Sequence, residues 1–457
     1  MSAIAAPNTL SDQLADDAPR MRILFLNPSG LFGGAERSLL DIIASLASAR
    51  PDWEMRLVAG SDGPLIRRAS AMNIAASVLP MPAMLAQVGD SAVRSSAGAM
   101  RVRLSLAANL LSAALATNRY ARMLAREIEQ VAPTLIYTNG FKMHVIGTWA
   151  ARSKAPVLWH IHDYVGARPV MSRLMRRQAS RCAGAITNSD SVRGDFSRVC
   201  RDRVAATTVY NAVDLDHFAP TGPAADLDAL ARMSAAVPGT VRVGLVATMA
   251  RWKGHQSFLR AIAELPADVR ARVRAYVIGG AIYPTRGSQS SADELRASAE
   301  RLGISECVGF TGFVDDVASA IRALDIVVHA STEPEPFGMV IVEAMACERA
   351  VIASQEGGAA ELFVDGENAL GHPPGDSEAL AERILRLTGD KELRSRLGKA
   401  GRATALRLYE STRLARELLA VYRQVSSREA VIGSVQREPE PALPSSHPGV
   451  AGRQASL

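Results

Sequence analysis

The chain has 457 residues, of which 48% are hydrophobic, 21% are charged and 5% are aromatic. This balance predicts a folded protein of two or three domains with a mainly aliphatic core, and it excludes a disordered chain. The longest apolar run, 104–116, is too short to span a bilayer, and residues 1–20 contain three Asp and no apolar stretch, so we expect neither a membrane-spanning nor a classically secreted protein.

Positive charge is concentrated in the first half of the chain. Residues 21–214 hold 24 Lys and Arg against 13 Asp and Glu, whereas residues 215–457 hold 27 against 30. A basic half predicts an anionic partner, which could be phosphate, nucleic acid or an acidic membrane surface. An ordinary arginine-rich surface explains the imbalance equally well. No basic motif interleaved with aromatic residues is present, so we do not expect nucleic-acid binding.

The cysteines predict neither a metal site nor disulfides. They are widely spaced and form no C-x-x-C pair, which is typical of free thiols in a reducing cytoplasm. The four residues are Cys182, Cys200, Cys307 and Cys347.

Short apolar segments alternate with helical patterns along most of the chain, which predicts α/β architecture with parallel sheets. The first series of expected strands is 22–27, 55–59, 75–79, 135–138, 157–162 and 183–188. The second series is 241–247, 273–279, 308–311, 325–330 and 350–353. A segment rich in Pro, Gly and Ala, 218–239, separates them, so we expect two doubly wound domains that face each other across a cleft.

The first expected strand leads into Gly33-Gly34, after which a helix begins. Adjacent glycines let the backbone approach an anion, and the helix N-terminus supplies free N–H groups. The spacing is neither G-x-G-x-x-G nor a Walker loop. A tight turn that serves only the fold accounts for the two glycines equally well.

Two histidines occur near the end of the strand expected at 157–162. Because side chains alternate along a strand, His160 and His162 lie on one face. His162 could face the cleft, with Asp163 orienting it, although a buried structural histidine is the plain alternative. No third ligand has a suitable spacing, so we predict no metal site.

The segment after the strand at 325–330 carries the strongest signal. A proline-containing loop ends near Gly338, where a helix begins whose open N–H groups could bind phosphate. Glu335 lies just before this helix, and Glu343 lies on its otherwise apolar face, where a carboxylate can accept hydrogen bonds from a vicinal diol. The alternative is a helix cap and one paired surface glutamate. Arg251 and Lys253 follow another strand end and could neutralise a diphosphate, and a glycine turn at 357–361 is expected to open a further helix.

Taken together, these segments resemble glycosyltransferase family 4 (glycosyl transferases group 1), the retaining sugar-nucleotide-dependent transferases of GT-B fold. The resemblance covers about 21–425, and its most specific part is the glutamate-x7-glutamate signature. The motifs occur in the family's order: G-G-A-E (33–36), H-D (162–163), T-N-S (187–189), Y-N-A-V-D (210–214), W-K-G-H (252–255), E-P-F-G-M-V-I-V-E (335–343) and G-G-A-A-E (357–361).

The resemblance implies two Rossmann-like domains and a C-terminal helix that crosses back to the first. The expected divisions are a disordered leader (1–20), an acceptor-side domain (21–213), a nucleotide-sugar-binding domain (214–408), a closing helix (409–425) and a disordered tail (426–457). It also implies a nucleotide-diphospho-sugar as co-substrate, with no cofactor and no metal, because cations replace the metal.

The resemblance assigns roles to individual residues. Glu343 would hold the ribose hydroxyls and Glu335 the sugar hydroxyls, while Lys253 and Arg251 would stabilise the leaving diphosphate and His162 would hydrogen-bond the donor sugar or the acceptor. The implied catalytic residues are Glu335, Lys253, Arg251 and His162. The implied donor-binding residues are Gly33, Gly34, Arg251, Lys253, Glu335, Phe337, Gly338, Met339, Val340 and Glu343. The family usually has an arginine five residues before the lysine that precedes the glycine of W-K-G-H. This chain has Thr248 at that position, and Arg251 is expected to substitute for the missing arginine.

The family's acceptors imply a glycan, a lipid-linked or a cell-envelope partner, and a cytoplasmic protein on the inner face of an anionic membrane. Two groups of arginines fit such a surface, although ordinary surface helices would carry them as well. The first group flanks 104–116 and the second lies further on: Arg94, Arg101, Arg103, Arg119, Arg122 and Arg126, then Arg173, Arg176, Arg177 and Arg181. Two other functions stay open, a sugar-nucleotide 2-epimerase of the same fold and a non-catalytic sugar-nucleotide-binding subunit.

Overall fold

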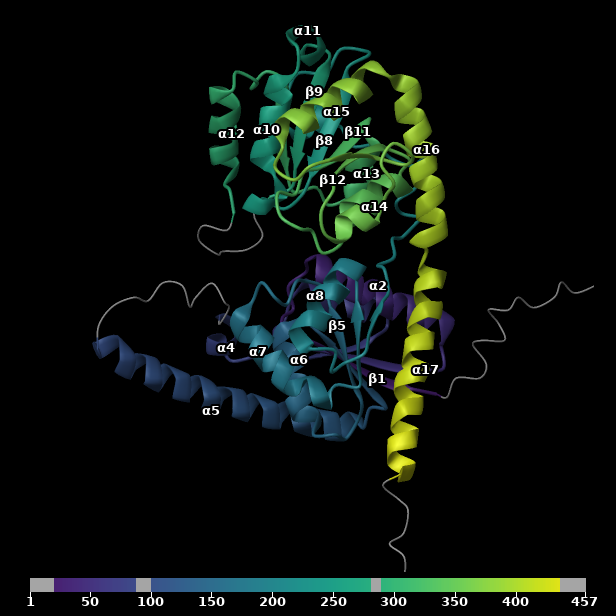
Figure 1. The fold of residues 1–457 in the computed structure, drawn as a ribbon. Coiled ribbons are helices and arrows are strands. Elements are labelled where there is room, and N and C mark those ends of the chain that lie inside the picture. Colours follow the sequence, from purple (N-terminus) through teal and green to yellow (C-terminus); the bar gives the residue numbers. More distant parts are fainter. Residues whose placement is uncertain (1–19, 88–99, 281–288, 436–457) are drawn as a thin grey trace, which may run out of the picture.

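The computed structural model describes residues 20–87, 100–280 and 289–435, and side chains within 20–85, 112–280 and 289–425. It contains two parallel sheets, each covered by helices on both faces (Figure 1). The predicted leader up to residue 19 and the predicted tail from residue 436 lie outside the described residues, as do the side chains of Arg94, Arg101 and Arg103.

The first sheet has seven parallel strands in the order β3-β2-β1-β4-β5-β6-β7. The strands are β1 (Arg22–Asn27), β2 (Glu54–Ala59), β3 (Ala75–Val78), β4 (Leu135–Asn139), β5 (Val157–Ile161), β6 (Gly184–Thr187) and β7 (Ala206–Thr208). Alternation along β1 sends Leu24 and Leu26 into the core on one face and Ile23 and Phe25 into the core on the other. All four side chains are fully buried.

Helices cover both faces of this sheet. One core is formed with α5 (Met100–Val131), α6 (Phe141–Ala151), α7 (Pro169–Gln178) and α8 (Asp190–Cys200). The other is formed with α2 (Gly34–Ala49) and α3 (Pro64–Ala71), while α4 (Ala83–Gln87) packs beside α5.

The second sheet has six parallel strands in the order β10-β9-β8-β11-β12-β13. The strands are β8 (Val241–Val246), β9 (Val273–Ile278), β10 (Val308–Gly312), β11 (Ile326–His329), β12 (Ala350–Ser354) and β13 (Leu370–His372). Its helices are α9 (Leu227–Leu230), α10 (His255–Glu264), α11 (Ala267–Arg270), α12 (Ala292–Arg301), α13 (Val317–Arg322), α14 (Met339–Ala346), α15 (Ser377–Gly389) and α16 (Lys391–Leu408).

The last helix, α17 (Ser411–Val435), returns the chain to the first domain. Figure 1 shows α16 and α17, in yellow, along one side of both domains. Leu418 and Tyr422 of α17 belong to the same buried core as α2 and β1. The predicted crossing is therefore confirmed, but the helix is longer than the expected closing helix, so residues 426–435 of the predicted tail are helical.

The structure differs from the sequence-based elements at three short segments. Strands β7 and β13 were not predicted, because three residues are too few to show an alternating pattern. The helix expected after Gly357 is a single 3-10 turn, Gly358–Glu361. Within the described ranges, no helix is both long enough and apolar enough to cross a membrane.

Candidate active site

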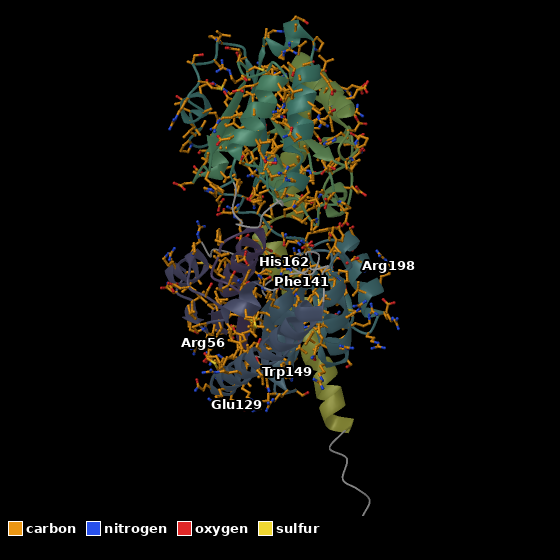
Figure 2. The ribbon with its side chains drawn as sticks, turned by 90° about the vertical axis from the view of Figure 1, so that its left-hand side faces the viewer. Arg56, Glu129, Phe141, Trp149, His162 and Arg198 are labelled. Carbon is orange, nitrogen blue, oxygen red and sulfur yellow. The ribbon has the colours of Figure 1, made fainter. Side chains whose placement is uncertain are left out.

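The predicted site residues lie where the strand order of each sheet reverses. This happens between β1 and β4 and between β8 and β11, and such points are where doubly wound sheets bind ligands. Gly33 and Gly34 follow β1, Lys253 follows β8, and Glu335 follows β11. Figure 2 labels His162, which follows β5, at the end of the first domain that faces the second.

Glu335 is buried and bound to a lysine. Its Oε1 and Oε2 lie 2.7 and 2.8 Å from Nζ of Lys253. Oε2 also accepts a hydrogen bond of 2.7 Å from Oγ of Ser331, and Nε2 of His329 lies 3.3 Å away. Burial acts to raise the pKa of Glu335, but Lys253 and His329 outweigh it and hold the pKa well below its usual range. Glu335 is therefore an ionised hydrogen-bond acceptor.

A glycine positions Lys253. The residue ends the 3-10 turn Arg251–Lys253, and the next residue, Gly254, has a φ of 75°. A Cβ at Gly254 would lie 1.7 Å from the carbonyl oxygen of Ala330, so only glycine lets this turn pack against the end of β11. Nζ of Lys253 also lies 4.1 Å from the ring centroid of Trp252, which restrains the side chain.

The helix α14 begins directly after the loop that carries Glu335. Gly338, with a φ of 101°, caps the helix, and Phe337 before it is buried against the rings of Tyr210 and Tyr409. The first backbone N–H groups of a helix, here those of Met339 and Val340, have no partner within the helix. Such groups are suited to bind an anion, and here they lie four and five residues after Glu335 in the chain.

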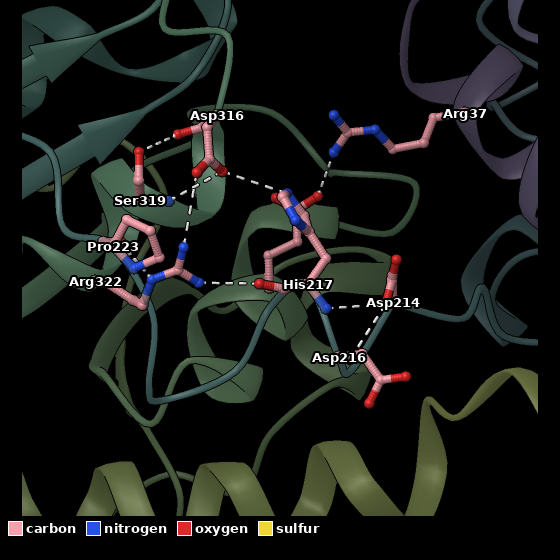
Figure 3. A network of polar contacts seen from close by, with 9 residues as sticks. Arg37, Asp214, Asp216, His217, Pro223, Asp316, Ser319 and Arg322 are labelled. Carbon is pink, nitrogen blue, oxygen red and sulfur yellow. Dashed lines mark hydrogen bonds and ion pairs between the residues drawn. The ribbon is translucent and has the colours of Figure 1, made fainter.

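Glu343 reaches the first domain. Its Oε1 lies 2.6 Å from Nη1 of Arg37 on α2, and its side chain is 5% exposed. Figure 3 shows the Arg37 side chain extending from the first domain to this contact. Burial raises the pKa of Glu343 although Arg37 acts in the opposite direction. Burial also raises the pKa of Asp41, one turn further along α2, to about 7, with Arg37 opposing and Glu343 adding to the shift.

Packing does not explain why the residue at position 34 is a glycine. A Cβ at Gly34 would meet nothing within 4 Å, and neither Gly33 nor Gly34 has a positive φ. The Gly33 N–H donates to Oε2 of Glu36 in the first turn of α2. A role in the fold alone is therefore not supported for Gly34.

His162 lies at the predicted position, but Asp163 does not orient it. The ring centroids of His162 and His160 are 3.7 Å apart, and Nε2 of His162 is buried without a partner in the described part of the chain. Burial lowers the pKa of His162 to about 3, so the ring is neutral. Asp163 instead pairs with Arg168 at 2.6 Å and accepts the N–H of Tyr164.

Arg251 contacts a carboxylate of the second domain. It is 53% exposed and its Nη2 lies 3.4 Å from a carboxylate oxygen of Glu294 on α12. Lys253, two residues later, instead contacts Glu335. The sequence spacing gave no sign that the two cations would have different carboxylate partners.

Several residues at the site were not predicted. Arg37 follows the G-G-A-E motif directly, His329 ends β11, and Ser331 lies two residues after that strand. These positions next to the motifs were the signal that the sequence offered. Glu361 was expected only as part of a glycine turn. Its two oxygens accept the N–H groups of Ser191 and Asp190, at 2.7 and 2.9 Å, and so cap α8 of the first domain.

Metal-ligand geometry is not seen in the described ranges. No three His, Cys, Asp or Glu side chains there lie close enough together to hold an ion.

Two family profiles match the chain. The profile described as Glycosyltransferase Family 4 matches residues 32–217, and Glycosyl transferases group 1 matches residues 234–404. Among curated proteins, the chain is similar to the putative glycosyltransferase EpsD of Bacillus subtilis, with 42% identity over 124 residues, 27% of this chain and 32% of that protein. It is 34% identical to the lipopolysaccharide core biosynthesis mannosyltransferase LpcC of Rhizobium leguminosarum over 191 residues, 42% of this chain and 51% of that protein. The matches thus span about a third to a half of these relatives.

Solved structures share the whole two-domain arrangement. The Anabaena protein Alr3699/HepE in complex with UDP is 26% identical, with a TM-score of 0.71 over 88% of this chain and 100% of that chain. WaaG, a glycosyltransferase involved in lipopolysaccharide biosynthesis, has the same fold, with a TM-score of 0.59 at 16% identity over 87% of this chain and 99% of that chain. Both halves of the chain are matched in order and the two-sheet fold is shared, so the chain belongs to the family 4 glycosyltransferases of GT-B fold.

Proposed function

We propose that the chain is a retaining glycosyltransferase that transfers a sugar from a nucleotide-diphospho-sugar to a glycan, lipid-linked or cell-envelope acceptor. One observation carries this proposal: the two glutamates of the signature both lie at the junction of the domains. Glu343 bonds to Arg37 of the first domain, and the carbonyl oxygen of Glu335 lies 3.4 Å from the Tyr164 hydroxyl of the same domain.

Glu335 and Lys253 form one ion pair, and each is suited to a different part of the reaction. The ionised Glu335 can accept hydrogen bonds from sugar hydroxyls and so orient the sugar. Lys253 has three donors and a full positive charge, which can also serve the departing diphosphate. Stabilisation of developing negative charge by fixed cations and dipoles is usually the largest catalytic contribution, and α14 adds its N-terminus.

The expectation that transfer needs no metal fits this charge arrangement. Lys253 and the first N–H groups of α14 lie beside the proposed diphosphate position and provide positive potential there. We expect transfer to persist in excess EDTA. Loss of activity that Mg²⁺ or Mn²⁺ restores would refute this part.

The donor and acceptor classes follow from relatives. HepE was solved with UDP and with UDP-glucose, and the names of relatives include lipopolysaccharide core and phosphatidyl-myo-inositol mannosyltransferases. We therefore propose a nucleoside-diphosphate hexose as donor and a glycolipid or envelope glycan as acceptor.

A screen of nucleotide sugars with purified protein and candidate acceptors tests the function. Glu335→Gln should lower kcat/KM by about 100-fold, because it removes the negative charge that pairs with Lys253 and accepts hydrogen bonds from the sugar. Glu343→Gln should raise the donor KM by about tenfold, the effect expected for a hydrogen bond to a charged group. Glu333→Gln, at an exposed position two residues before Glu335, is the matched control and should stay within about twofold. Full activity in both site variants would refute the assignment.

The same reactions distinguish the alternatives. Retention predicts a product whose anomeric configuration, read by NMR, equals that of the donor sugar. Isomerisation of the nucleotide sugar without acceptor would indicate the 2-epimerase. Donor binding with no turnover on any acceptor would indicate the non-catalytic subunit.

We also propose that α7 contacts an anionic membrane surface. Val170 and Leu174 on this helix are 41% and 37% exposed, and the exposed Arg173 and Arg177 lie beside them. Exposed apolar side chains with arginines beside them are typical of helices that lie on anionic lipid. Co-sedimentation with phosphatidylglycerol vesicles but not with phosphatidylcholine vesicles is expected, and Leu174→Asp should reduce it. Equal binding to both vesicle types would refute the proposal.

A further inference from the structure

Arg37 connects the first domain to the carboxylate that we assign to the donor's ribose. Resting on the proposed function, we propose that Arg37 is itself a donor-binding residue: its guanidinium, which contacts Glu343 in this structure, turns to the diphosphate when the ribose hydroxyls occupy Glu343. The first domain would thus contribute a cation to the nucleotide, and not only its glycine turn.

The guanidinium has capacity for such a contact. An arginine side chain carries five N–H donors in a planar fork that matches phosphate oxygens two at a time. Among the described residues, Arg37 uses one donor, Nη1, on Oε1 of Glu343. The side chain is still 35% exposed, so the remaining donors can reach an incoming anion.

Arg37 links the glycine turn of the first domain to α14 of the second. It is in the first turn of α2, three residues after Gly34, and it contacts Glu343 of α14. Glu343 is four residues beyond Met339, the first residue of α14, which corresponds to about 6 Å along the helix axis. A nucleotide that set its ribose on Glu343 and its diphosphate at the start of α14 would pass beside the guanidinium.

The other predicted cations already have carboxylate partners. Lys253 is bound by both oxygens of Glu335, and Arg251 lies beside Glu294 with half of its surface exposed. A diphosphate needs positive charge on more than one side, and Arg37 can supply it from the opposite domain.

Burial disfavours the charged forms of the acidic neighbours of Arg37. Burial raises the pKa of Glu343, and it raises the pKa of Asp41 to about 7. Both carboxyl groups therefore favour their neutral forms more than an ordinary carboxyl group does. A diphosphate would therefore be a more highly charged partner for the guanidinium than either carboxyl group.

Calorimetric titrations with a nucleoside diphosphate and with its parent nucleoside test the proposal. The diphosphate is whichever of UDP, GDP and ADP binds the unmodified protein best. Arg37→Gln should weaken diphosphate binding by about tenfold while nucleoside affinity stays within about twofold, because only the diphosphate loses a charged partner. Arg37→Lys, which keeps the charge but loses the fork, should show a smaller loss. Arg67→Gln, an exposed arginine of α3, should change neither.

The outcomes separate this inference from the proposed function. If Arg37→Gln changes both affinities by the same factor, or leaves diphosphate binding unchanged or tighter, Arg37 only covers Glu343 and the inference is wrong. If the unmodified protein transfers sugar and the variant binds the diphosphate normally, only the inference fails. If the unmodified protein binds none of the three diphosphates, both fail. Thermal melting shows whether Arg37→Gln folds. If it does not fold, the ratio of diphosphate affinity to nucleoside affinity is measured with Arg37→Lys instead.

Discussion

Ser331 Oγ lies 2.7 Å from Oε2 of Glu335, four residues further along the same loop. Both side chains are buried, so the hydroxyl cannot be replaced by bulk solvent without cost. Together with Lys253, it fixes the direction in which the carboxylate faces.

We expect Ser331→Ala to lower kcat/KM by about tenfold, because it removes one hydrogen bond to a charged group. The effect should fall mainly on kcat, since Lys253 still holds the carboxylate in place. Steady-state kinetics checks this. Ser354→Ala is the matched control, because Oγ of Ser354 is equally buried but has no partner within the described part of the chain. Equal losses in both variants would mean that the hydroxyl acts only through packing.

Lys253→Gln should move the acid limb of the kcat/KM profile to higher pH. Lys253 is the principal group that opposes the burial of Glu335, so its removal lets desolvation raise the pKa of Glu335. Activity is lost when Glu335 becomes protonated, so a higher pKa of Glu335 moves this loss of activity to a higher pH. A pH–rate profile measures the shift. Arg251→Gln, two residues earlier, should leave the acid limb in place, and an unshifted limb in Lys253→Gln would contradict the assignment.

Glu361→Gln should lower the free energy of unfolding by about 1 kcal/mol, the usual effect of a charged helix cap. The carboxylate also accepts the hydroxyl of Tyr210 at 3.0 Å, so three donors lose a charged partner. Chemical denaturation gives the value. The exposed Glu356→Gln provides the baseline for a surface charge change, and an identical result for the two would show that the cap is not stabilising.

Asp41→Asn should stabilise the protein more at high pH than at low pH. Burial raises the folded-state pKa of Asp41 from its usual 3.8 to about 7, so the stability of the unmodified protein falls as the pH rises between these two values. The variant lacks this titration, and its advantage should grow by about 1–3 kcal/mol between pH 4 and pH 8. Unfolding curves at several pH values measure it, with the exposed Asp216→Asn as control. A constant difference would contradict the expectation.

The sequence predicted the architecture because its longer strands are strongly patterned. The four consecutive apolar residues of β1, Ile23 to Leu26, and the signature from Glu335 to Glu343 leave few alternatives for the strand–loop–helix units that contain them. Strand β13 and the 3-10 turn at Gly358 were missed because segments of three or four residues are too short to show a periodic pattern of apolar residues.

Contacts made by single side chains were harder to predict. The pairing of Arg37 with Glu343 joins residues 306 positions apart, so no local pattern can reveal it. Asp163 was expected beside His162 because the two are adjacent in sequence, yet Arg168, five residues further on, is a stronger electrostatic partner and takes the carboxylate.

The path of α17 limits how this protein can be divided. Leu414, Leu418 and Val425 fill the same layer as Leu158 and Ile186 of the first sheet, although they come from the end of the chain. A fragment that stops at residue 213 would leave that layer open to water and should aggregate. Co-expression with a peptide of residues 409–435 should restore a soluble fragment, so the two halves of the molecule depend on each other for assembly.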